Sequence, residues 1–264
     1  MREGRGWRWW GMKIHAVQLD CVWEDPEANR VKVEGLLAEL RCEEGDLVVL
    51  PEMFLTGFSL KTEVTVQASG GEHEAMLAGW AGRLGCAVMG GVVSRSEGGV
   101  FNEAVAYGPG GEVLVRYAKR QPFSLGNELS VHAAGRQAKV FDWVGLRVGP
   151  LVCYDLRFPE VAREAVALGA EMLVCIASWP VARVEHWVTL LRARAIENQA
   201  WVVGVNRCGK DPHFTYPGRS VVVDPQGVVV ADAADREGVL SVDCDAEVVR
   251  GWRGAFPALR DAGI

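Results

Sequence analysis

The chain has 264 residues, of which 49% are hydrophobic and 23% are charged, values that are ordinary for a folded protein with a sizeable core. The formal net charge is -6, and lysine and arginine are scattered rather than grouped, which argues against a nucleic-acid partner. The seven cysteines are odd in number, widely spaced and without a C-x-x-C pair, which argues against a disulfide framework and a structural zinc site and favours a cytoplasmic protein.

The chain is expected to form one domain that follows a short extension. Residues 1–11 are rich in arginine and tryptophan but lack the apolar segment and cleavage site of a signal peptide, so we expect a disordered extension there. The domain is expected over residues 12–264. No run approaches the roughly 20 apolar residues that a membrane span requires, and no membrane partner is expected.

Predicted strands and helices alternate along almost the whole chain. In chain order, strands are predicted at 13–19, 46–50, 86–94, 100–107, 113–117, 146–153, 172–176, 201–206, 220–223, 228–231 and 239–242. Helices are predicted at 26–40, 72–84, 160–168, 184–199 and 246–253. Turns are predicted at 108–111 and 224–227, whereas 119–137 has no periodicity and is predicted to be a functional or disordered loop. The pattern predicts a single α/β domain of stacked layers.

Cys153 lies where a predicted strand gives way to a helix. Unpaired backbone N–H groups and the positive end of the helix dipole favour a thiolate at such a junction, and the same N–H groups can hold a developing oxyanion. The alternative is an inert core thiol, because free cysteine is among the most buried residue types.

Glu52 and Lys119 also follow predicted strands. Each residue alone is more often a solvated loop residue. Together with Cys153, however, they supply the parts that covalent acyl transfer requires. A carboxylate can take the thiol proton and return it to a leaving amine, while a fixed cation and a backbone N–H stabilise the tetrahedral intermediate.

Three sequence blocks resemble the catalytic blocks of the nitrilase superfamily of carbon-nitrogen hydrolases. They read PEMFLTGF at 51–58, YAKR at 117–120 and CYDLRFPE at 153–160, and the resemblance covers residues 12–249. The stretches SWPVAR at 178–183 and LLRARAIENQ at 190–199 are similar to the omega-amidase branch. Members of that branch hydrolyse the terminal amide of 2-oxo dicarboxylic acid monoamides.

The resemblance implies a role for each matching residue. Cys153 would be the nucleophile, Glu52 the general base and Lys119 the oxyanion partner, with Tyr154 lending its backbone N–H. Glu128 lies where many members carry a second glutamate that orients the lysine or the substrate amide; an exposed loop acid is the alternative. The implied fold is a four-layer αββα sandwich, usually paired through its outer helices, so we expect a homodimer or a higher homo-oligomer.

Candidate substrate contacts surround these residues. Arg183 is expected to grip a substrate carboxylate, since a guanidinium fork suits that group, and a salt bridge to a neighbouring acid is the alternative. We expect Phe58, Phe123 and Trp179 to line the pocket, with a core role as the alternative. The block at 190–199 is expected to serve packing or a subunit interface.

Other charged residues are given structural roles or mark departures from the family pattern. Arg157 and Glu160 flank a helix start and are predicted to be structural ion-pair partners. Gln121 and Pro122 stand where relatives commonly have His-Leu, and the proline is expected to stiffen the pocket wall. Arg219 replaces an expected small or acidic residue, and its cation either attracts a dicarboxylate or reaches solvent.

The sequence therefore predicts an amidohydrolase that acts through a cysteine thioester and releases ammonia. The expected partner is a small-molecule amide, a 2-oxo dicarboxylic acid monoamide of the 2-oxoglutaramate or 2-oxosuccinamate type. No cofactor is expected, and no metal either, because the five histidines show no ligand spacing. The alternatives are another amidase, such as an N-carbamoyl amino acid hydrolase, and a catalytically silent binding module on the same scaffold.

Overall fold

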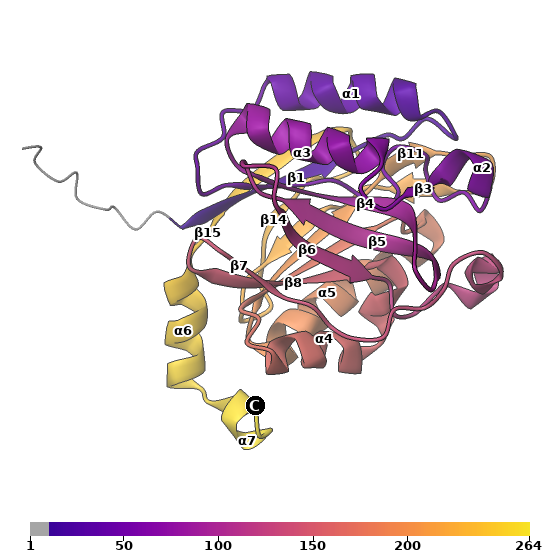
Figure 1. Cartoon of the computed structure of the whole chain (residues 1–264). Coiled ribbons are helices and arrows are strands. Elements are labelled where there is room, and N and C mark those ends of the chain that lie inside the picture. Colours follow the sequence, from indigo (N-terminus) through magenta and orange to yellow (C-terminus); the bar gives the residue numbers. More distant parts are fainter. Residues whose placement is uncertain (1–10) are drawn as a thin grey trace, which may run out of the picture.

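Two β-sheets lie face to face, and helices cover their outer surfaces (Figure 1). The computed structural model describes residues 11–264. The expectation of a disordered extension at 1–11 therefore lies, except for Gly11, outside the described residues. The four layers agree with the αββα sandwich that the sequence predicts.

The first sheet has seven strands in the order β15-β1-β2-β4-β5-β6, with β3 paired to β4. These strands are β1 (Met12–Gln18), β2 (Leu47–Val49), β3 (Val66–Ala68), β4 (Ala87–Ser96), β5 (Gly99–Tyr107), β6 (Val113–Ala118) and β15 (Gly238–Cys244). The second sheet has six strands in the order β14-β13-β10-β9-β8-β7. They are β7 (Phe141–Trp143), β8 (Leu146–Val152), β9 (Met172–Ala177), β10 (Trp201–Asn206), β13 (Val221–Val223) and β14 (Val229–Asp232). A separate hairpin joins β11 (Cys208–Lys210) to β12 (Thr215–Pro217).

Seven α-helices are present in the described part of the chain. They are α1 (Pro26–Ala38), α2 (Thr62–Thr65), α3 (Glu72–Leu84), α4 (Pro159–Ala167), α5 (Val184–Asn198), α6 (Ala246–Ala255) and α7 (Ala258–Asp261). Short 3-10 helices are η1 (Ser124–Gly126), η2 (Glu128–Ser130), η3 (Cys153–Arg157) and η4 (Val181–Arg183). None of the helices within residues 11–264 is both long and apolar enough to cross a bilayer.

The layers form because neighbouring strand residues point to opposite faces. In β1, Ile14 belongs to the core between the sheets, whereas Val17 belongs to the core beneath α1 and α3. On the far side of the molecule, α4 and α5 cover the second sheet, and Trp187 and Leu191 of α5 pack there with no exposed area. Both faces of the central strands are thus buried, which explains their nearly continuous apolar sequences.

The predicted elements agree with the structure where their pattern is long. The helix predicted at 72–84 is α3, and the strand predicted at 201–206 is β10. The predictions missed β3, β7, β11 and β12, each three residues long, because three residues are too few for an alternating pattern. The loop at 119–137 is ordered by η1 and η2 and contributes to the site described below.

Candidate active site

The residues predicted to be catalytic follow strands that end at one edge of the two sheets. Glu52 comes shortly after β2, Lys119 directly after β6 and Cys153 directly after β8. β2 and β6 run in the same direction, because β2 is parallel to β4 and two antiparallel pairings separate β4 from β6. Their carboxyl ends therefore meet, and the facing sheet brings the end of β8 to the same place.

A buried lysine lies between two carboxylates. Lys119 Nζ is 2.9 Å from Glu52 Oε1 and 2.8 Å from Glu128 Oε2, and the three side chains are at most 1% exposed. The Asn102 amide donates to both carboxylates, at 2.8 Å to Glu52 Oε1 and 2.9 Å to Glu128 Oε1. The alternative of an exposed loop acid at Glu128 is therefore wrong. Two carboxylates from separate segments therefore hold the ammonium group, and Asn102 from a third segment holds the carboxylates.

Burial and nearby charges set the protonation of this cluster. Burial alone would lower the pKa of Lys119, but the charges of Glu52 and Glu128 raise it above its ordinary value. Burial also opposes ionisation of Glu128, yet the Lys119 charge and a hydrogen bond from His132 lower the pKa of Glu128 to about 2. For Cys153, burial and the Glu52 charge raise the thiol pKa well above its ordinary value, although Lys119 acts in the opposite direction. Together these effects favour the neutral thiol rather than the thiolate that the strand-to-helix junction was expected to favour.

The backbone around Cys153 differs from the strand-to-α-helix junction that the sequence predicts. Cys153 begins the 3-10 helix η3, and α4 starts only at Pro159, so the dipole of an α-helix does not point at the sulfur. The φ of Cys153 is 48°, in the left-handed region. For a residue other than glycine this conformation costs about 1–3 kcal/mol, and such strain is typical of functional positions.

Asp155 connects the segment that carries Lys119 to the one that carries Cys153. Its buried carboxylate accepts hydrogen bonds from the Tyr117 hydroxyl at 2.8 Å and the Gln121 N–H at 2.8 Å. It also accepts one from the Val152 N–H at 3.0 Å. Asp155 thereby fixes the ends of β6 and β8 relative to each other. The sequence analysis did not single it out, although it lies only two residues after Cys153.

Glu52 is fixed in the same way by its neighbours. The Ser178 N–H, at the end of β9, donates to Glu52 Oε2 at 2.9 Å. Gly91 lies so close that a Cβ placed there would be 2.5 Å from Glu52 Cα, and only glycine leaves room for this approach. One oxygen of the Glu52 carboxylate thus accepts a hydrogen bond from Lys119, and the other accepts one from the backbone N–H of Ser178.

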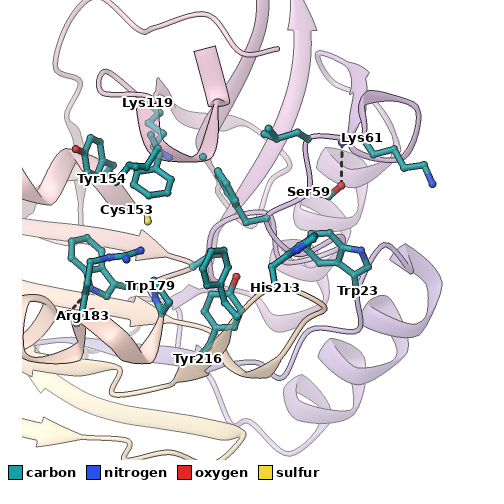
Figure 2. Close-up of a pocket in the computed structure, with 18 of the residues that line it drawn as sticks. Trp23, Ser59, Lys61, Lys119, Cys153, Tyr154, Trp179, Arg183, His213 and Tyr216 are labelled. Atoms are coloured by element: carbon teal, nitrogen blue, oxygen red, sulfur yellow. Dashed lines mark hydrogen bonds between the residues drawn. The ribbon is translucent and has the colours of Figure 1, made fainter. Parts of the chain in front are cut away.

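A cavity of about 640 Å³ opens above these groups and includes Lys119 and Cys153 in its wall. Figure 2 shows the Cys153 sulfur between Lys119 and Tyr154 on one side and Trp179 and Arg183 on the other. All five predicted substrate contacts line this cavity: Phe58, Phe123, Tyr154, Trp179 and Arg183. In the described part of the chain Arg183 forms no salt bridge, so it remains available to a ligand, and its guanidinium carbon lies 5.7 Å from the Phe123 ring centroid.

Arg157 provides a second cation in the cavity wall. Its guanidinium carbon lies 4.7 Å from the Trp179 ring centroid. The prediction that Arg157 and Glu160 form a structural ion pair is wrong, because within residues 11–264 neither takes part in a salt bridge and Glu160 is exposed. Burial, followed by the positive charge of Arg183, lowers the pKa of Arg157. Two neighbouring guanidinium groups without an acidic partner favour an anionic ligand.

The two departures from the family pattern have different outcomes. Arg219 does not line the cavity; its Nε lies 2.8 Å from Asp232 Oδ2 on β14 and its side chain is 35% exposed, so of the two alternatives the side chain reaches solvent. Around Pro122, by contrast, the Gln121 N–H donates to Asp155 and the Phe123 N–H donates to Glu128. Proline, which has no N–H, thus stands between two residues whose N–H groups both donate hydrogen bonds, and Phe123 lines the cavity.

The outer wall of the cavity contains residues that the sequence analysis missed. Trp23 comes from the segment before α1, and His213, Phe214 and Tyr216 come from the β11–β12 hairpin. Trp23 and His213 contact edge to face, with ring centroids 5.6 Å apart. Nothing in the sequence links these segments, which lie about 190 residues apart in the chain.

The chain is similar to known proteins over most of its length. The family model described as carbon-nitrogen hydrolase matches residues 13–254. The omega-amidase YafV of Yersinia enterocolitica is 37% identical over 95% of this chain and 96% of its own length. The 2-oxoglutaramate amidase of Bacillus subtilis is 32% identical over 94% of this chain and 96% of its own length. The crystal structure of XC1258 from Xanthomonas campestris, a CN-hydrolase superfamily protein with an arsenic adduct in its active site, is similar with a TM-score of 0.90 and 38% identity, over 95% of this chain and 97% of that one.

The Glu128→Gln variant tests the buried cluster. The pKa of Glu128 is lowered from 4.5 to about 2 in the folded chain, so its ionised form stabilises the fold above pH 4.5 and this contribution is lost as the pH falls toward 2. We expect the variant to be less stable than the wild type by up to about 3 kcal/mol at pH 6, with the difference shrinking toward pH 3. Urea unfolding of both proteins across this pH range measures the difference in their free energies of unfolding. A difference that is constant with pH contradicts an ionised Glu128 in the folded chain.

Proposed function

The chain belongs to the carbon-nitrogen hydrolase family, and from this premise we propose that it hydrolyses the terminal amide of a 2-oxo dicarboxylic acid monoamide. Substrates of the 2-oxoglutaramate or 2-oxosuccinamate type fit this proposal. One observation carries the proposal. Cys153 and Lys119 line a cavity together with Arg157 and Arg183, and Glu52 is paired with Lys119 behind the cavity wall. The relatives named omega-amidase and 2-oxoglutaramate amidase support the substrate class.

In the proposed reaction, Cys153 Sγ attacks the amide carbon while its proton passes to Glu52. A base is needed because the surroundings of Cys153 favour the neutral thiol, which is a weaker nucleophile than the thiolate. The oxyanion is stabilised by Lys119 Nζ and by the backbone N–H of Tyr154. Glu128 holds the ammonium in position and Asn102 in turn holds Glu128, so little reorganisation is needed when the negative charge develops.

The tetrahedral intermediate then collapses to a thioester. Glu52 returns the proton to the leaving nitrogen, and ammonia departs. Glu52 next takes a proton from water, which attacks the thioester carbon. Collapse of this second intermediate releases the carboxylic acid and restores the Cys153 thiol.

The two arginines of the cavity wall would bind the carboxylate of the substrate. A guanidinium group donates two parallel hydrogen bonds to a carboxylate, and the aromatic rings of Trp179 and Phe123 hold the flat faces of Arg157 and Arg183. An anion between the two groups would also relieve their mutual repulsion, which contributes to the lowered pKa of Arg157.

We also propose that the chain forms a homodimer through its outer helical layer. Support comes from Leu168 at the end of α4, which is 48% exposed, and from Ile196 on α5, which is 54% exposed. Both are large apolar side chains on the helices that cover the second sheet. We expect sedimentation equilibrium to give twice the chain mass for the wild type and a shift toward the single-chain mass for Ile196→Glu. A wild type that sediments as a single chain contradicts the proposal.

Replacing the nucleophile or the base tests the reaction. With 2-oxoglutaramate as substrate, we expect Cys153→Ala to release ammonia at the uncatalysed rate and Glu52→Gln to lose about 10²- to 10⁴-fold in kcat. Circular dichroism confirms that each variant is folded. Near wild-type turnover by Cys153→Ala would rule out the thioester route, and carbon dioxide accompanying the ammonia from a carbamoyl substrate would favour an N-carbamoyl amino acid hydrolase.

Replacing the arginines tests the substrate class. We expect Arg157→Gln and Arg183→Gln each to lower kcat/KM for 2-oxoglutaramate by about 10- to 100-fold, because each loses a charged hydrogen bond to the carboxylate. An uncharged amide such as butyramide should be hydrolysed with little change. Arg219→Gln is the matched control, since Arg219 pairs with Asp232 outside the cavity. An equal loss for both substrates would mean that the arginines only shape the cavity.

A further inference from the structure

A second group of reactive side chains lies at the opposite end of β2 from Glu52. Asp46 directly precedes β2, Cys42 lies in the loop between α1 and β2, and His15 is on β1. The catalytic mechanism uses none of these residues. His15 and Asp46 are buried, at 3% and 4% exposure, whereas Cys42 is partly exposed.

The potential ligand atoms of this group lie near the spacing of the ligands of a bound metal ion. One atom from each of His15, Cys42 and Asp46 lies within 4.8 Å of the others, and His15 Nε2 is 3.0 Å from Asp46 Oδ2. In tetrahedral zinc sites the bonds are about 2.0–2.1 Å to nitrogen and about 2.3 Å to sulfur, which places neighbouring ligand atoms roughly 3.3–3.7 Å apart. A small shift would therefore admit the ion.

The surroundings orient these ligands from the outside. His15 Nδ1 lies 2.8 Å from the Ser241 hydroxyl oxygen on β15, which leaves Nε2 facing the other two residues. The Glu43 N–H donates to Asp46 Oδ2 at 2.8 Å. Metal-binding histidines characteristically have such a partner on the second ring nitrogen, because it fixes the tautomer and the ring orientation.

The chemistry of the donors selects the ion. A thiolate, an imidazole and a carboxylate suit zinc rather than magnesium or calcium, which prefer oxygen ligands alone. Within residues 11–264, Asp46 forms an ion pair with His15 alone, so no lysine or arginine occupies the place of the cation.

We propose that His15, Cys42 and Asp46 bind a zinc ion through Nε2, Sγ and a carboxylate oxygen. The ion would link the loop between α1 and β2 to β1, at the end of β2 opposite to Glu52. It stabilises the fold and takes no part in amide hydrolysis. Spacing alone gave no hint of the site, because residue 15 is far from residues 42 and 46 in the sequence.

Cobalt spectroscopy tests the thiolate ligand. Titration of the reduced, metal-free protein with Co²⁺ should produce a thiolate-to-cobalt charge-transfer band in the near ultraviolet, saturating at one equivalent and displaced by Zn²⁺. We expect Cys42→Ser to lose the band and Cys153→Ser to keep it. No band in the wild type, or a band that survives in Cys42→Ser, overturns the proposal.

A variant at the protein surface tests the outer contact. Ser241 is exposed, so Ser241→Ala should fold normally. We expect its Zn²⁺ affinity, measured by competition with a chromogenic chelator, to fall about 10- to 100-fold, and Ser241→Thr to restore it because threonine keeps the hydroxyl. Zn²⁺ should also raise the thermal midpoint of the wild type and not that of Cys42→Ser. Unchanged affinity in Ser241→Ala, or an equal rise of the midpoint in Cys42→Ser, contradicts the site.

Discussion

The ammonium of Lys119, enclosed by the carboxylates of Glu52 and Glu128, is the interaction on which the rest of the site depends. Removing one member of a buried ion pair typically costs about 3–5 kcal/mol, because a charge is left without a partner. Asn102 bridges the two carboxylates and so makes the three charges one unit. The geometry of this unit follows from β2, β5 and β6, which are parts of a single sheet.

The second sheet supplies the sulfur and the contacts that align the two halves. Asp155 accepts hydrogen bonds from both sides of the gap between the sheets, and Ser178 donates its N–H to Glu52. These contacts cross between the layers at the point where the strands end. The sandwich therefore determines the relative positions of the carboxylate, the amine and the thiol, whereas the loops mainly shape the cavity above them.

The cavity and the cluster around His15 are at opposite ends of β2, and they present different chemistry. The cavity wall combines aromatic rings with two guanidinium groups, which suits a small anionic molecule. The other cluster presents nitrogen, sulfur and oxygen ligands without a competing cation, which suits a metal ion. Because β2 lies between the two groups, a metal ion at the proposed site would not contact the residues that line the cavity.

The sequence alone determined the long elements and indicated the candidate reacting groups. Hydrophobic periodicity located α3 and β10, and three blocks of residues indicated Glu52, Lys119 and Cys153, because these features are local in the chain. Only the tertiary structure decided the position of Arg157 in the cavity wall, the link made by Asp155, the surroundings of the Cys153 thiol and the grouping of His15 with Cys42. Each of these depends on burial or on contacts between segments far apart in the sequence, and the spacing of residues along a chain carries no information about either.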